Sequence, residues 1–274
     1  MTAASPAPSP ASPAGATLGA LLRREAAPMI AAALGGMIVP LSAFLIARAA
    51  GVPGRDPVTA FLALAVIWVT FAPPILAAGP DGIGAAILRA GCAIDGTFLA
   101  LLVLWALAAS VSFVGAMGAY ATLAAVGLAG IAAARCARTG AGRYTAAVLA
   151  VGIQTAVLAA PFALGGAIRA LSNAAAGRAL SWCYHVHPLA SAAAALRPGT
   201  DVVWGKIGWL YWVSDSGSYP SPVPTPWYAA ALVYLALAGV LGGAAWLAGR
   251  RVATGGPEAL AEARPTAGRP ARDG

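Results

Sequence analysis

Apolar residues in this chain fall into long blocks, which short polar or turn-rich segments separate. A helix needs about 20 residues to cross the roughly 30 Å hydrocarbon layer of a bilayer. The blocks lack the alternation of barrel strands, so we expect the spanning elements to be helices. The expected spans are Pro28–Ala47, Pro57–Ala78, Ala93–Phe113, Val114–Ala134, Tyr144–Ile168 and Trp227–Ala248. The pattern predicts an all-α, polytopic integral membrane protein with about six transmembrane helices.

The boundary between the third and fourth spans follows from length alone. Residues 93–134 form one apolar stretch, which is too long for a single span and therefore has to fold back. Ser110–Gly118 holds the only small and polar residues suited to a turn there. We therefore place the turn in that segment.

Four further segments complete the predicted organisation. Residues 1–16 are rich in Pro, Ala and Ser and carry no charge, which predicts a disordered tail. Thr17–Ala27 sets leucines opposite two arginines and a glutamate, as in a short interfacial helix at the start of a transmembrane domain over residues 17–251. Residues 169–226 hold four of the eight tryptophans, and a fifth, Trp227, follows directly, so we expect residues 169–226 to form an extracytoplasmic segment along the membrane surface. Residues 252–274 are expected to form a flexible cytoplasmic tail.

Composition and charge narrow the class further. The chain is 60% hydrophobic and 9% charged, whereas soluble domains carry about 25% charged residues. Its net charge of +8 is scattered between the blocks, so no nucleic-acid partner is expected. With six spans and the N-terminus inside, 11 of the 17 Lys and Arg residues fall inside and 6 outside. Because cytoplasmic loops carry the excess of Lys and Arg, both termini are predicted to be cytoplasmic, with the chain in the inner or plasma membrane.

Two polar residues near or inside spans are candidates for chemistry. Asp95 would be a proton or substrate site if it lay within hydrocarbon. Alternatively, near the expected start of the third helix it would reach the interface and the positive helix end. Gln154, in the middle of the fifth span, is expected to make an interhelical hydrogen bond, with substrate contact as the alternative.

Cys183, His185 and His187 could ligate copper, zinc or haem iron. The two histidines would share a face only in an extended segment, and no carboxylate lies nearby to orient them. We therefore expect no metal site. A haem-handling, metal-handling or redox membrane subunit that uses these histidines stays as an alternative function.

Catalytic motifs are absent from the sequence. The stretch GTDVVWGKI around Lys206 does not fit a phosphate-binding loop, and neither a GxSxG elbow nor an HExxH pair occurs. The chain is therefore not expected to be an enzyme.

The order of segments resembles the membrane subunit of ABC-2 type transporters, bacterial exporters in which a six-span permease pairs with a separate ATPase. The similarity lies in LLRREAAPMI before the first span, VGLAGIAAARCARTGAGRYTAAVLA, HPLASAAAAL and the closing PTPWYAAALVYLALAGVLGGAAWLAGRR, and covers most of residues 17–251. The resemblance implies a permease homodimer or heterodimer in membrane lipid. It also implies an ATP-binding cassette ATPase subunit as partner.

Further expectations follow from this resemblance. Arg23, Arg24, Asp81 and Arg89 would contact the ATPase subunit, which uses ATP while this chain holds no cofactor. No substrate-binding residue carries over from the family. The remaining alternative is a structural or accessory membrane subunit without transport activity.

Overall fold

The structure is a computed structural model that describes residues 18–51, 57–80, 82–108, 110–163, 167, 170–196 and 226–262. The described residues form α1 (Leu18–Ala50), α2 (Pro57–Ala78), α3 (Ile83–Leu107), α4 (Phe113–Arg135), α5 (Gly140–Ala163), α7 (Asn173–Val186), α8 (Pro188–Leu196) and α10 (Tyr228–Glu262), and no strand occurs among them. Six of these helices are long and apolar enough to cross a membrane. The predicted all-α fold with six spans is confirmed.

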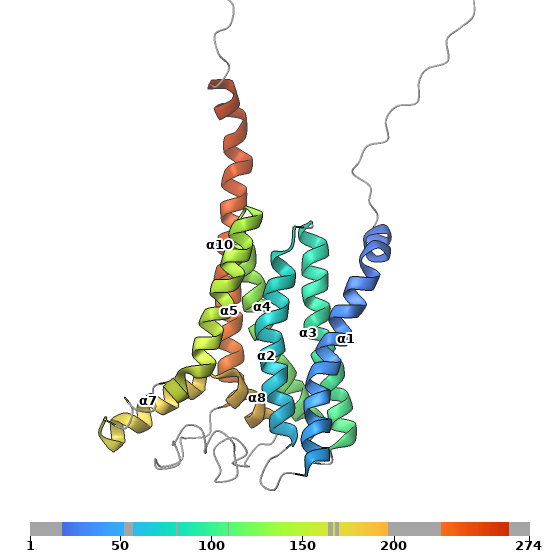
Figure 1. The fold of residues 1–274 in the computed structure, drawn as a ribbon. Helices are drawn as coiled ribbons and strands as arrows, with labels where there is room; N and C mark the ends of the chain where they lie inside the picture. Colours follow the sequence, from blue (N-terminus) through green and yellow to red (C-terminus); the bar gives the residue numbers. More distant parts are fainter. Residues whose placement is uncertain are drawn as a thin grey trace, which may run out of the picture.

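The six long helices pack side by side as a bundle (Figure 1). The start of α1, the α2–α3 connection, the α4–α5 connection and the end of α10 all lie at one end of it. The shorter helices α7 and α8 lie at the other end. Because the number of crossings is even, the start of the first helix and the end of the last helix lie at the same end. The charge distribution predicts this arrangement.

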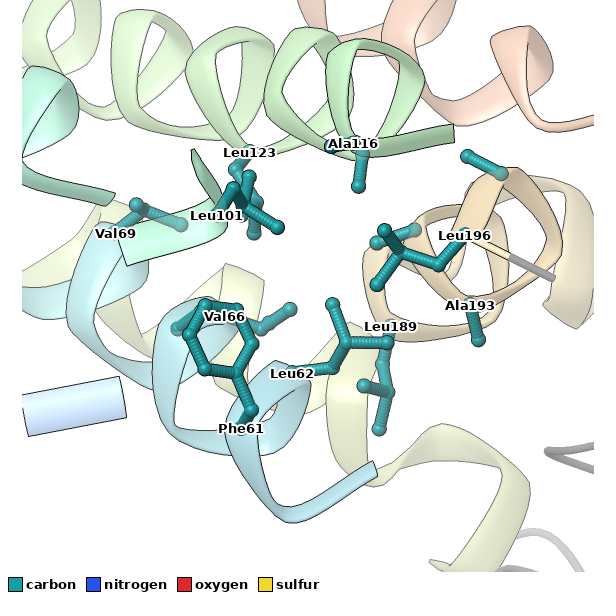
Figure 2. Packing of buried hydrophobic residues seen from close by; sticks show 14 of the residues in the cluster. Phe61, Leu62, Val66, Val69, Leu101, Ala116, Leu123, Leu189, Ala193 and Leu196 are labelled. Carbon is teal, nitrogen blue, oxygen red and sulfur yellow. The ribbon is translucent and has the colours of Figure 1, made fainter. Parts of the chain in front are cut away.

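The centre of the bundle is built on α2 and α4. Phe61, Leu62, Val66 and Val69 of α2 lie in one cluster with Leu123 of α4 (Figure 2), and all five side chains are fully buried. Leu101 of α3 and Leu196 of α8 close this cluster. Because lipid tails are as apolar as these side chains, close packing and not exclusion of water holds such helices together.

Glycines allow α1 and α3 to approach each other closely. A Cβ atom added to Gly96 would meet the backbone carbonyl of Ala33, and one added to Gly36 would meet that of Ala93. The Trp68 indole Nε1–H of α2 donates a hydrogen bond of 3.0 Å to the same Ala93 carbonyl. These contacts fix α1 against α3 and tie both helices to α2.

Several boundaries differ from those expected. The bounds of α2 are as predicted, but the segment expected as a separate interfacial helix forms the first turns of a continuous α1. Helix α3 begins at Ile83 and not near Ala93, because the residues before Ala93 are mostly helix formers such as Ala, Ile and Leu. Its turn into α4 lies just before the predicted centre, where the Ser112 hydroxyl accepts a hydrogen bond of 3.0 Å from the Gly115 amide and caps α4.

The last two spans are also shifted. Helix α5 both begins and ends before the expected limits, at Gly140 and Ala163. Helix α10 continues past the expected end at Ala248 and reaches Glu262, so the first residues of the expected C-terminal tail are helical. The expected N-terminal tail and residues 263–274 lie outside the described residues.

The segment between α5 and α10 contains two helices with different surroundings. Helix α7 projects away from the bundle, whereas α8 lies within its end (Figure 1). All but one of the residues of α8 are buried, against α2, α4 and α10. Gly115 and Gly118 of α4 make room for this contact, since a Cβ atom on either would press on Ala195. Residues 197–225, with Trp204, Trp209 and Trp212, lie outside the described residues.

Candidate functional site at the charged end of the bundle

An ion pair joins the first turns of α1 and α3. Glu25 Oε2 lies 3.0 Å from Arg89 Nε, and the two side chains are 8% and 16% exposed. A charged group within an apolar helix costs several kcal/mol unless it is paired. Pairing with Glu25 therefore explains how Arg89 is accommodated inside α3 instead of in a polar loop.

Arg23 and Arg24 directly precede Glu25 on α1, and both are exposed. The ion pair thus brings three of the four predicted ATPase contacts, Arg23, Arg24 and Arg89, to one end of the bundle. The fourth, Asp81, lies outside the described residues, although the flanking Pro80 and Gly82 belong to the α2–α3 connection at this end.

Three further arginines, contributed by the α4–α5 connection, lie at the same end. Arg135, the last residue of α4, lies within electrostatic range of Arg89 and of Arg143 in α5. The Arg143 Nη2 group donates a hydrogen bond of 3.3 Å to the Arg138 carbonyl. All three guanidinium nitrogens of Arg135 are buried and have no hydrogen-bond partner among the described residues.

We call Arg23, Arg24, Glu25, Arg89, Arg135, Arg138 and Arg143 the charged end. Six of these seven residues are arginines, and the one carboxylate among them, that of Glu25, is already paired with Arg89. The sequence predicts that these arginines lie on one side of the membrane. It does not predict that the others lie near Arg89, because only the packing of α3, α4 and α5 brings them together. An excess of positive charge of this kind suits an anionic partner surface.

His187 lies between α7 and α8 and is 1% exposed. Its Nε2–H donates to the Leu158 carbonyl of α5 at 3.2 Å, and its Nδ1 accepts from the Ala190 amide at 3.3 Å. Burial lowers the pKa of His187 to about 4, so the ring is neutral at pH 7. His187 thus caps α8 and ties it to α5.

This geometry gives the metal alternative no support. Both ring nitrogens of His187 are engaged by the backbone, and His185 and Cys183 lie on α7. Within the described ranges, no three His, Cys, Asp or Glu side chains gather closely enough to hold a metal ion. His187, one of the three candidate ligands, instead fixes α8 in place.

Gln154 makes the interhelical contact that its position predicts. Its Nε2–H donates a hydrogen bond of 3.1 Å to the Val126 carbonyl, which connects α5 to α4 inside the bundle. The prediction of an interhelical hydrogen bond is confirmed.

Asp95 lies in the middle of a span and not near the start of one. Because α3 begins at Ile83, the residue is about 18 Å along the helix at 1.5 Å per residue. The expectation that Asp95 sits at the interface, based on a later start of α3, is therefore wrong. Its side chain is exposed on the bundle surface, and its Oδ1 accepts a hydrogen bond of 2.7 Å from the Tyr120 hydroxyl of α4.

The fold and these contacts define the class of the protein as a multi-pass helical membrane protein. No family model, curated protein or solved structure matches the chain.

Proposed function

We propose that this chain is the permease subunit of an ABC-2 type ATP-binding cassette transporter, which moves a substrate across the membrane while a separate subunit hydrolyses ATP. The observation that carries this proposal is the Glu25–Arg89 ion pair at 3.0 Å. A permease has to convert movement of an ATPase at its surface into movement of its spans. The ion pair links α1, which carries the exposed Arg23 and Arg24, to α3 and thus to the interior of the bundle.

The charge of the same end supports an external protein partner. Arg23, Arg24 and Arg138 are exposed at this end, so they are accessible to carboxylates on the surface of an ATPase subunit. The excess of Lys and Arg on this side supports a cytoplasmic location of the charged end and of both termini, on the side of the membrane where ATP is available.

Two copies of the permease, identical or related, form the pathway in this proposal. The outward faces of α1, α5 and α10 carry large exposed apolar side chains, among them Ile46, Ile153 and Val240. Such faces are suited to membrane lipid or to a second copy. The chain itself binds no ATP and needs no cofactor.

Charge reversal tests the proposed contact. We expect Arg23→Glu combined with Arg24→Glu to abolish copurification of an ABC ATPase subunit with the tagged chain from its own membranes. The matched control is Arg48→Glu, which changes an exposed arginine in the last turn of the same helix, at the opposite end of the bundle. Unchanged ATPase recovery with the double variant would refute the contact.

A second measurement separates a permease from an accessory subunit. We expect ATP hydrolysis by the partner, reconstituted in lipid, to change when this chain is omitted, because a permease controls closure of its ATPase. Identical hydrolysis with and without the chain would favour an accessory subunit without transport activity.

A further inference from the structure

A carboxylate in the middle of a membrane span requires a partner. Asp95 is exposed at the centre of α3, where an unpaired charge would face hydrocarbon. Ionisable residues at this depth are expensive, and they mark substrate pathways or pair with an opposite charge. The Tyr120 hydroxyl donates one hydrogen bond of 2.7 Å to Oδ1, but no Lys or Arg of the described ranges pairs with this carboxylate.

Two pairs of aromatic rings lie between α3 and α4, one of them next to this carboxylate. The rings of Phe98 and Tyr120 lie 4.9 Å apart between centroids, and the phenol of Tyr120 is the group that bonds Asp95. Further along, Trp105 and Phe113 form an edge-to-face pair at 5.5 Å, and they are 44% and 48% exposed.

Helical spacing puts these groups on one stripe. Asp95, Phe98 and Trp105 are three and seven residues apart in turn on α3, and Phe113 precedes Tyr120 by seven residues on α4. Residues three, four or seven apart lie on one face of a helix. We call Asp95, Phe98, Trp105, Phe113 and Tyr120 the aromatic–carboxylate face.

We propose that the aromatic–carboxylate face binds a lipophilic organic cation, which is the substrate class of the transporter. This inference rests on the proposed permease function. A carboxylate supplies the opposite charge, and the faces of Trp, Tyr and Phe rings attract cations in addition. A hydrophilic ion would not reach this depth, and an anion would be repelled by Asp95. The ligand therefore needs both a positive charge and an apolar surface.

The test is equilibrium binding of radiolabelled tetraphenylphosphonium to the full chain in lipid nanodiscs, without ATP or an ATPase, after subtraction of binding to empty nanodiscs. Tetraphenylborate has nearly the same size and shape with the opposite charge, so it serves as the control ligand. We expect saturable binding of the phosphonium alone. Saturable binding of both ions, or of neither, would overturn the inference.

Variants localise the site. Asp95→Asn keeps the shape but removes the charge, and we expect it to weaken phosphonium binding at least tenfold. Asp95→Glu is expected to retain most of the affinity, which separates loss of charge from loss of fold. Tyr120→Phe keeps the ring and loses the hydroxyl, so a smaller loss of about threefold is expected from the weaker positioning of Asp95. Unchanged affinity in Asp95→Asn would assign the cation to another surface.

The outcome is independent of the partner. Failure of phosphonium binding would remove the substrate class while leaving contact with an ATPase subunit open to its own test. Conversely, cation binding that depends on Asp95 would persist if no ATPase subunit were found, and would then point to a transporter of another kind.

Discussion

Glu25 of α1 and Arg89 of α3 form a largely buried ion pair, 3.0 Å between Oε2 and Nε, that connects two helices far apart in sequence. Removing one partner of such a pair leaves the other charge without compensation. We expect Glu25→Gln to lower the free energy of unfolding by about 2 kcal/mol or more, measured by denaturation in detergent.

Two controls accompany this prediction. Arg24→Gln, one residue away and exposed, is expected to stay within about 0.5 kcal/mol of the parent. In the double variant with Arg89→Gln, the loss should be smaller than the sum of the two single losses, because both charges are removed. Strict additivity would show that the two side chains do not stabilise each other.

The close approach of α1 and α3 depends on Gly96. A Cβ atom there would meet the Ala33 carbonyl, which is backbone and cannot swing away. Overpacking of this kind costs about 1–3 kcal/mol, so Gly96→Ala should lower the unfolding temperature. Gly91→Ala on the same helix is the matched control, since its Cβ atom meets nothing within 4 Å. Equal behaviour of the two variants would contradict the packing described for α1 and α3.

The buried His187 predicts a loss of stability in acid. Burial lowers the pKa of His187 from 6.5 to about 4, so the unfolded chain takes up a proton at a pH at which the folded chain does not. Stability therefore falls as the pH drops from about 6.5 toward 4, by up to about 3 kcal/mol from this group.

His187→Asn should flatten this part of the pH profile, since Asn can still cap α8 but does not titrate. His185→Gln keeps His187 in place and should keep the acid sensitivity. Unfolding midpoints measured between pH 4 and 8 compare the three proteins. An unchanged profile in His187→Asn would assign the acid sensitivity to other groups.

Two cysteines report the orientation in the membrane. Cys136, in the α4–α5 connection, and Cys183, in α7, belong to opposite ends of the bundle. With single-cysteine variants in intact cells, we expect a membrane-impermeant maleimide to label Cys183 from outside, and Cys136 only after the membrane is opened. Labelling should be done at alkaline pH, because burial raises the pKa of both thiols. The reverse labelling pattern would place the charged end outside.

Much of the bundle could be predicted from the sequence, because spans are set by the length of apolar blocks. The bounds of α2 follow directly, since turn residues flank it on both sides. The early start of α3 could not be predicted in this way. Arg89 indicates a polar loop as long as its ion pair with Glu25 of another helix is not known. Because the predicted start of α3 is too late, the sequence predicts Asp95 at the edge of the span, whereas it lies in the middle.

The position of α8 depends on contacts that local sequence does not encode. Its residues are mostly alanine, which fits a surface helix and a buried one equally well. Burial follows from Gly115 and Gly118 on α4, which leave space for Ala195, and from the bonds of His187 to α5 and α8. Likewise, the charge count finds the arginines of the charged end, but only the packing of α3, α4 and α5 brings Arg89, Arg135 and Arg143 together.

Site-specific photocrosslinking tests the proposed function most directly. Photoreactive benzoylphenylalanine would replace Arg24 in one form of the chain and Arg48, at the far end of α1, in another. After irradiation of native membranes, we expect the crosslinked product of the Arg24 form to be an ABC ATPase subunit, identified by mass spectrometry. The Arg48 form should give none. Absence of an ATPase from the Arg24 product, or its equal capture at Arg48, would contradict a permease that meets its ATPase at the charged end.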